Sequence, residues 1–424
     1  MNITIKKIDF DKVNTFFLLM FAFFLPLSRA LNSFCVIYFI IIFLLNIRKN
    51  DFLKKYLTNS LILVIILFVL YLTVSILWSE DKTKGMSVLK YYWQWIAIFG
   101  IALVVSLKPE KIKSVISAFI FGMLVSEILS YGMFFEIWHI NGKGADEPSP
   151  YMMRIDYSVF LAFTAMILLN RLFSHNYSRK EKILIAIFFI TVAGNLFINK
   201  GRTGQLSFLV AIFISFFLHY RVSLKNFIIV SLFAIFIFSI AYNVSNHFKM
   251  RVNAGIVDIQ KVLEGQYNTS WGLRVAQYFI AKDLVQKNLL CGTGIGGRDA
   301  SVKELFEKND YTFLENTKNF LASNHSHNQY LQIIIENGLI GFILMLLLLY
   351  NLFKLRIKDS ELNELKVIFV TIYMVAFIAE PLWLKQFTNV LFILFTGLFI
   401  GASLSKNMGN EKEFYLNKKE KNEI

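Results

Sequence analysis

A short polar segment late in the chain carries the residue types best suited to proton transfer. It spans residues 324–332 (NHSHNQYLQ) and leads directly into an apolar stretch, 333–355. Two histidines with amide and hydroxyl neighbours are therefore expected where water meets hydrocarbon. A neutral histidine at a helix start, such as His327, can accept the proton of an attacking hydroxyl. The alternative is that His325 and His327 only cap a membrane helix.

The spacing after this histidine suggests a groove. Gly338 follows His327 by eleven positions, and Gly341 comes shortly afterwards. In one continuous helix those positions would return almost to the same face at about 3.6 residues per turn. Small residues there would let a partner helix or a lipid tail approach closely.

Arg202 is the cation with the most informative surroundings. It lies in residues 199–206 (NKGRTGQL), a tight turn that opens a helix. Thr203 is expected to cap that helix, and the helix N-terminus favours anions. A guanidinium beside it can bind a phosphate through two hydrogen bonds. The alternative is an arginine that extends to the lipid headgroups.

Three more cations are weaker candidates for substrate binding. Arg274 lies near the start of an expected loop helix, 271–287, beside Trp271. Arg154 and Lys90 fall at the outer ends of expected spans, next to aromatic residues. A surface arginine explains Arg274 equally well, and a membrane-interface belt explains the other two.

Together these residues favour one kind of reaction, transfer from a lipid-linked pyrophosphate. Arginines would neutralise the leaving diphosphate, and the histidine would accept the proton of the attacking hydroxyl. The glycine-rich residues 292–297 lack the strand and the Lys-Ser/Thr of a phosphate loop, which favours a hinge or close backbone packing. His325-x-His327 could hold a cation, but no carboxylate or cysteine pattern completes a site. We therefore expect no metal and no cofactor.

Composition defines the elements that must position these groups. The chain has 424 residues, of which 56% are hydrophobic and 16% aromatic. Apolar runs of about 20 residues recur, as in helical membrane proteins. We predict an all-α, polytopic protein with about twelve spans and one large, partly helical periplasmic loop. The expected spans are 13–28, 30–47, 58–78, 89–106, 113–136, 156–174, 182–199, 204–220, 226–243, 329–354, 365–383 and 387–405.

The distribution of positive charge predicts the orientation. With the N-terminus in the cytoplasm, 25 of the 44 Lys and Arg residues fall in cytoplasmic tails and loops, and 9 in short outer loops. The rest lie in one long segment, which the positive-inside rule does not count. The net charge of +15 therefore reflects topology and not a nucleic-acid surface.

This topology divides the chain into four parts. They are an N-terminal membrane region at 1–243, a periplasmic loop domain at 244–328, a C-terminal membrane region at 329–405 and a charged cytoplasmic tail at 406–424. Both termini are expected in the cytoplasm and the site in the periplasm. The first apolar stretch reads as a retained span and not as a cleaved signal. Cys35 and Cys291 show no disulfide or metal-ligand pattern.

Two motifs resemble the bacterial O-antigen ligase family. Arg202-Thr203-Gly204-Gln205-Leu206 fits the family's Arg-x₃-Leu pattern. His327-Asn328, with Gly338-Leu339-Ile340-Gly341 after nine residues, fits its His-[Asn/Ser/Gln]-x₉-Gly-x-x-[Gly/Thr/Tyr] pattern. The resemblance covers roughly residues 13–405.

The resemblance implies a metal- and nucleotide-independent glycosyltransferase of the bacterial inner membrane. Its donor would be a glycan on undecaprenyl diphosphate, and its acceptor a sugar hydroxyl of the lipid A core. His327 would be the proposed base, and Arg202 and Arg274 would bind the diphosphate. Arg154, Lys90, Asn328 and His325 are further candidates for substrate binding. Membrane lipids are expected partners, and the resemblance leaves the oligomeric state open.

Three other functions stay open. An O-antigen polymerase uses the same donor but often has two large periplasmic loops, whereas one is expected here. A protein O-oligosaccharyltransferase would accept a protein side chain, often with an extra soluble domain. A lipid or anion transporter predicts cations in mid-span, broken helices and repeated halves. The expected charges lie at outer span ends instead.

Overall fold

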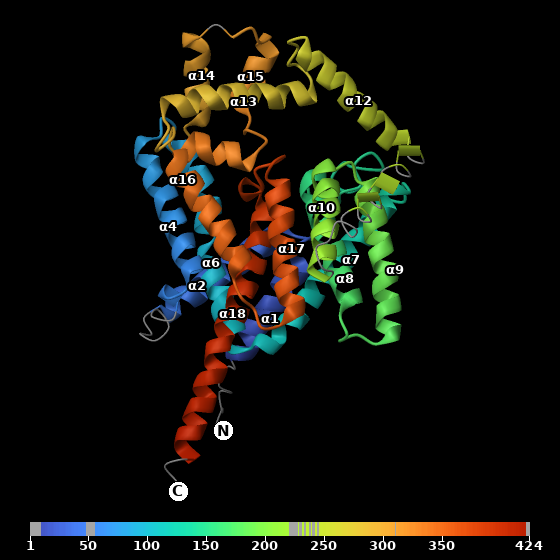
Figure 1. The fold of residues 1–424 in the computed structure, drawn as a ribbon, viewed down its shortest axis with the longest axis vertical. Coiled ribbons are helices and arrows are strands. Elements are labelled where there is room, and N and C mark those ends of the chain that lie inside the picture. The colour runs from blue at the N-terminus through green and yellow to red at the C-terminus, as the bar shows by residue number, and fades with distance from the viewer. Residues whose placement is uncertain are drawn as a thin grey trace, which may run out of the picture.

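The computed structural model describes residues 10–47, 56–219, 246–309 and 311–420, and a few residues between 228 and 243. In these parts the chain is helical, apart from turns, loops such as residues 135–153 and one isolated bridge between Ile140 and Lys143. Figure 1 shows a bundle of long helices with a smaller helical layer across one end. The bundle helices are α1 (Phe10–Phe24), α2 (Arg29–Asn46), α4 (Ser60–Val74), α5 (Lys82–Trp93), α6 (Ile96–Leu107), α7 (Ile112–Phe134), α8 (Arg154–Phe173), α9 (Arg179–Ile198), α10 (Arg202–His219), α16 (Gln329–Lys354), α17 (Ser360–Ala376) and α18 (Gln386–Glu420).

Eight segments in the described chain are long and apolar enough to cross a membrane. The all-helical membrane architecture is confirmed, but the predicted twelve spans are not. Helix α10 is apolar over Arg202–Leu218 but shorter than these segments, and the expected span 226–243 falls largely outside the described residues. Helix α18 lies at the centre, with 89% of its apolar window buried, whereas α9 lies at the edge with 17% buried.

The charged residues of the bundle separate into two ends. At the end away from the helical layer, Lys108 pairs with Asp11 and Lys113 with Asp359. At the other end, Lys385 pairs with Asp156, and Lys200 with Asp146. Those latter cations belong to the set that the charge rule assigns to the outer side.

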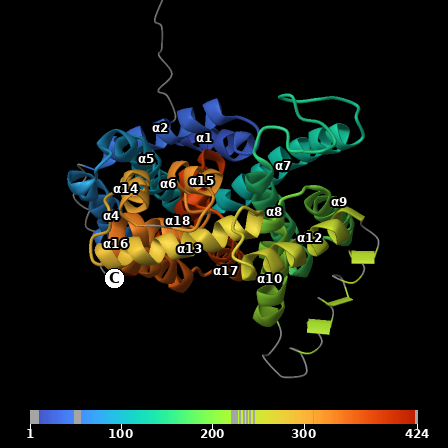
Figure 2. The same ribbon diagram turned by 90° about the horizontal axis from the view of Figure 1, so that it is seen from above.

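The helical layer consists of α12 (Asn246–Leu263), α13 (Ser270–Lys287), α14 (Arg298–Lys308) and α15 (Glu315–Ser323). The expected loop helix at 271–287 is present as α13, which crosses above the bundle from the α10 side to the α16 side (Figure 2). Ala276, Ile280 and Leu284 of α13 form a small core with Leu321 and with Ile335 of α16. This core attaches the layer to the bundle through the first turns of α16.

Helix α16 is interrupted at Gly338, where φ is +61° and ψ is −163°. The break frees backbone groups that the loop before α14 uses. The N–H of Thr293 donates to the carbonyl of Ile335 (2.9 Å), and the N–H of Leu339 donates to the carbonyl of Leu289 (2.8 Å). Buried backbone groups must find partners, so the loop and the broken helix stabilise each other.

The break at Gly338 contradicts the expected continuous helix from His327 and agrees with the expected close packing of residues 292–297. His327 does not share a continuous helix with Gly338, because α16 starts at Gln329 and is interrupted at Gly338. The predicted groove at Gly338 is occupied by residues 289–294 of the same chain and not by a partner helix or a lipid. The glycine-rich residues 292–297 are therefore a close backbone packing site. Glycine is required because the loop passes where side chains would stand.

Replacing Gly338 with alanine should destabilise the fold. A methyl group there would collide with the backbone of Leu290, and alanine disfavours positive φ, so we expect a loss of about 1–3 kcal/mol. Thermal unfolding of the detergent-solubilised protein would show a lower Tm. Gly255→Ala is the matched control, because a Cβ there meets nothing within 4 Å. Equal Tm values for the two variants would contradict the strained junction.

Candidate functional site

His327 lies in the turn between α15 and α16, in a conformation that its neighbours must hold. Its φ is +48°, an uncommon value for a residue with a side chain. The ring of Phe320 stacks on the imidazole, with centroids 5.7 Å apart and an interplanar angle of 3°. Nδ1 lies 3.2 Å from Oε1 of Glu380, in the turn after α17. The ring is therefore fixed on one face and along one edge.

Glu380 belongs to a buried charge network that joins three elements. Its Oε2 lies 3.2 Å from Nζ of Lys385, which lies 3.5 Å from Oδ1 of Asp156 in the first turn of α8. The three side chains are 2%, 13% and 5% exposed in that order. Two carboxylates contact one ammonium group, and that of Glu380 also lies beside the histidine.

The pKa values of this network follow from its contacts. Burial alone would raise the pKa of Glu380, but His327 and Lys385 hold it at about 2. Burial would lower the pKa of Lys385, but Asp156 and Glu380 raise it instead. For His325, burial and the neighbouring His327 lower the pKa to about 4. Glu380 and Lys385 are thus charged near neutral pH, and His325 is neutral.

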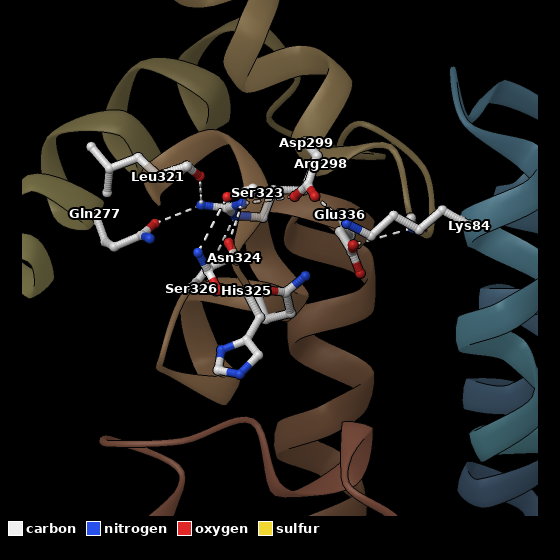
Figure 3. Close-up of polar contacts among 12 residues, drawn as sticks. Lys84, Gln277, Arg298, Asp299, Leu321, Ser323, Asn324, His325, Ser326 and Glu336 are labelled. Carbon is white, nitrogen blue, oxygen red and sulfur yellow. Dashed lines mark hydrogen bonds and ion pairs between the residues drawn. The ribbon is translucent and has the colours of Figure 1, made fainter. Parts of the chain in front are cut away.

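A buried arginine, Arg298, fixes the segment that carries both histidines (Figure 3). Its guanidinium donates to Oγ of Ser326 (3.0 Å) and to the carbonyls of Asn324 (2.6 Å) and Leu321 (2.9 Å). It also donates to Oε1 of Gln277 on α13 (2.7 Å). The side chain is 1% exposed, and Asp299 neutralises it at 2.9 Å. Asp299 in turn contacts Lys84 of α5.

Sequence reasoning missed Arg298, Glu380 and Asp156, and gave Lys385 no role. Glu380 and Asp156 stand inside runs assigned to spans, where an unexplained charge signals function or pairing. That signal could have identified both carboxylates. Nothing in the sequence distinguishes Arg298 from the other cations of its segment.

The turn that carries Arg202 packs directly on α8. Gly201 and Gly204 lie so close to the backbone of α8 at Arg154 and Ser158 that a Cβ would not fit. The expected cap, Thr203, lies within α10, and Oγ of Ser158 accepts from the N–H of Gly204 instead (3.1 Å). The N–H of Gly204, one of the helix N–H groups predicted to bind an anion, is therefore already hydrogen-bonded to Ser158.

Arg202 lines a cavity of about 710 Å³ between this turn and α12. Lys200 lines it too, paired with Asp146 at 2.9 Å, and Glu136 is also part of the wall. Trp271 of α13 completes the wall on the layer side. The cavity thus joins cations to apolar surface, as a charged amphiphile requires.

One face of α13 connects this cavity with the histidine. Trp271, Arg274 and Tyr278 are three or four residues apart, so they lie along one face of the helix. Trp271 lines the cavity, and the hydroxyl of Tyr278 accepts from Nδ2 of Asn328 (3.1 Å). Seven residues of helix span about 10 Å. Arg274 lies between the two ends, half-buried and without a hydrogen bond or ion pair to the described residues.

The other predicted residues have mixed placements. Asn328 caps α16, because its Oδ1 accepts from the N–H of Leu331 (3.1 Å), so both ends of its amide have protein partners. Arg154 is exposed at the start of α8, two residues before Asp156. Lys90 is exposed in the last turn of α5, beside Tyr91, whose carbonyl accepts from Asn389 (2.9 Å). The turn of Arg202 contacts α8 at Ser158, and His327 connects to α8 through Glu380, Lys385 and Asp156.

We expect no metal from the sequence because no carboxylate or cysteine pattern accompanies His325 and His327, and the structure shows that this reason is wrong. Glu380 supplies the carboxylate that the sequence pattern lacked. One ligand atom from each of His325, His327 and Glu380 lies within 4.8 Å of the other two.

Residues 187–346 match the family model described as O-antigen ligase. This match supports the O-antigen ligase family for that region. It includes both motifs on which the predicted resemblance rests, and Arg298 as well, so that prediction is confirmed. Glu380, Lys385 and Asp156 lie outside the matched residues. No curated protein matches the chain.

Arg298→Lys should loosen the histidine segment despite conserving the charge. An ammonium group cannot reach all five acceptors of the guanidinium, and breaking a buried polar network costs about 3–5 kcal/mol. We expect a lower Tm and faster proteolysis within residues 270–328. Lys287→Ala, which removes an exposed ion pair with Glu304, is the control and should behave like the wild type. Unchanged proteolysis in Arg298→Lys would show that this network is dispensable.

Proposed function

We propose that the protein transfers a glycan from undecaprenyl diphosphate to a sugar hydroxyl of the lipid A core, as an O-antigen ligase. The family match supports a ligase-type transferase. The observation that carries the finer proposal is the contact between His327 and the buried Glu380. It gives the histidine of the family motif the partner that a general base requires.

The proposed base works through its tautomer. An ionised carboxylate only accepts hydrogen bonds, so Glu380 holds the proton of His327 on Nδ1. The lone pair then resides on Nε2, which can take the proton of the acceptor hydroxyl. The imidazolium formed is stabilised by the negative charge of Glu380. The hydroxyl oxygen attacks the anomeric carbon as the bond to the diphosphate breaks.

The diphosphate is proposed to lie between Arg202 and Arg274. Arg202 faces a cavity with apolar walls, where the lipid chain would enter, and Arg274 stands between that cavity and His327. Their charges would stabilise the leaving diphosphate, at about 1.5–3 kcal/mol for each charge-assisted hydrogen bond. The structure gives Arg154 and Lys90 no role beyond adding positive charge at this end of the bundle. Asn328 acts by positioning, because it caps α16 and holds Tyr278.

We also propose the topology on which this reaction depends. The end of the bundle that carries the site faces the periplasm of the inner membrane, and both termini face the cytoplasm. Support comes from the charge bias of the loops. Lys108 and Lys113, which belong to the larger, cytoplasmic set of cations, lie at the end of the bundle away from the site. Both lipid-linked substrates would then reach the site from the outer leaflet. The reaction is proposed to need no metal.

The test is reconstitution of the purified protein with an undecaprenyl-diphosphate glycan and a lipid A–core acceptor, without ATP or divalent metal. Formation of a glycosylated lipid A core supports the ligase. A lengthened undecaprenyl-linked chain would indicate a polymerase instead. Movement of the lipid across the bilayer without a new glycosidic bond would indicate a transporter.

In this assay His327→Ala should lower the transfer rate by about 10²–10⁴-fold, because the general base is lost. Glu380→Gln should also lower the rate, because an amide can leave the wrong tautomer of His327. His139→Ala changes an exposed histidine of the loop after α7 and is the control. Wild-type rates in His327→Ala, with membrane insertion intact, would remove this histidine from the mechanism.

Arg202→Lys should lower transfer at least tenfold although it keeps the charge. An ammonium group lacks the planar pair of donors that binds a phosphate through two hydrogen bonds. The measurement is the transfer rate against donor concentration, and we expect a higher KM for the donor. Arg179→Lys, at the start of α9, is the matched control at the opposite end of the bundle. Full activity in Arg202→Lys would indicate that only a point charge is needed.

A further inference from the structure

The cluster of His325, His327 and Glu380 has the dimensions of a transition-metal site. Nδ1 of His327 lies 3.2 Å from Oε1 of Glu380, and Nε2 of His325 lies 3.9 Å from its Oε2. A tetrahedral zinc ion with bonds of about 2.0 Å separates its ligand atoms by about 3.3 Å. Only small side-chain movements are needed to bring the three groups to that spacing.

The charges around the cluster also favour a cation. Glu380 and Asp156 are buried, and Lys385 is the ammonium that both contact. Arg298, on the other side of the histidines, is neutralised by Asp299. The buried carboxylate of Glu380 favours a cation beside it. Its Oε1 faces His327, whereas Oε2 contacts Lys385, so an ion can bind one oxygen while the lysine keeps the other.

We propose that His325, His327 and Glu380 form an inhibitory site for a divalent transition-metal ion of the Zn²⁺ class. Imidazole nitrogens and a carboxylate are suitable ligands for zinc, and a water molecule would complete the tetrahedron. The surrounding residues place the rings before the ion arrives, because Phe320 stacks on His327, and Arg298 holds the carbonyl of Asn324 and the hydroxyl of Ser326 on either side of His325.

Inhibition follows from the tautomer of His327 and therefore rests on the proposed function. A metal ion on Nδ1 displaces the proton that Glu380 holds there. The neutral imidazole then carries its proton on Nε2, where the lone pair of the base is needed. Metal binding thus requires the lone pair of His327 on Nδ1, whereas deprotonation of the acceptor requires it on Nε2. Chelation of the ion would restore the active tautomer.

Binding has one identifiable cost. The backbone N–H of His327 donates to Nδ1 of His325 at 3.2 Å. When Nε2 of His325 binds a metal, its proton must move to Nδ1, and this hydrogen bond is lost. One neutral hydrogen bond is lost, whereas three bonds from protein ligands to zinc are formed. The site can therefore lose this bond and still bind zinc.

The test compares Zn²⁺ binding by the full-length detergent-solubilised protein with binding by His325→Ala, using equilibrium dialysis and elemental analysis. We expect the wild type to bind one more Zn²⁺ per chain than His325→Ala at micromolar concentrations. His139→Ala, which changes a histidine outside the cluster, should bind as the wild type does. Equal stoichiometry in the wild type and His325→Ala would overturn the site.

A second measurement distinguishes this proposal from the proposed function. Zn²⁺ should inhibit wild-type glycan transfer, EDTA should restore it, and the half-inhibitory concentration should rise at least about tenfold in His325→Ala, relative to that variant's own rate. Inhibition that is equal in both proteins would overturn the inhibitory role. Zinc bound at the site without transfer under any condition would uphold the site and contradict the ligase proposal.

Discussion

The geometry of the site depends on the hydrogen bonds that the buried guanidinium of Arg298 makes. It joins α13, α15 and the segment before α16, and through Asp299 it reaches α5. Removing an arginine from water is costly unless each donor finds an acceptor. Here the acceptors are largely backbone carbonyls and polar side chains of the very segment that carries His327. These hydrogen bonds offset the cost of burying the guanidinium, and they fix a turn that has no regular structure of its own.

The broken helix α16 solves a second positioning problem. A continuous helix would leave the loop at residues 289–294 without partners for its buried backbone groups. The interruption at Gly338 supplies two carbonyls and two N–H groups to that loop, so the helical layer is joined to a helix of the bundle by hydrogen bonds. The first turns of α16 then belong to the site, while the remainder belongs to the bundle. Arg298 is the first residue of α14, the helix that follows this loop, so the break in α16 also helps to position Arg298.

The site itself combines charges from elements far apart in sequence. Asp156 comes from α8, Glu380 and Lys385 from the turn between α17 and α18, and His327 from the turn before α16. The first turn of α8 also supports the turn of Arg202. A charge network in the proposed outer end of the bundle therefore links the histidine to the cations. In this arrangement the same negative charge that would stabilise an imidazolium also attracts metal ions.

The sequence by itself determined the helical membrane architecture, the two motifs and the helix at 271–287, because hydrophobic periodicity and residue spacing are local properties. It could suggest that His327 and Arg202 act together, and their family resemblance is confirmed, but their roles remain proposals. Only the tertiary structure decided that Gly338 breaks α16, that Ser158 caps α10, and that Glu380 faces the histidines. Each of these depends on contact between segments distant in the chain, where burial and packing outweigh local preference. The pairing of His327 with Glu380 across 53 residues is such a contact, and no spacing rule encodes it.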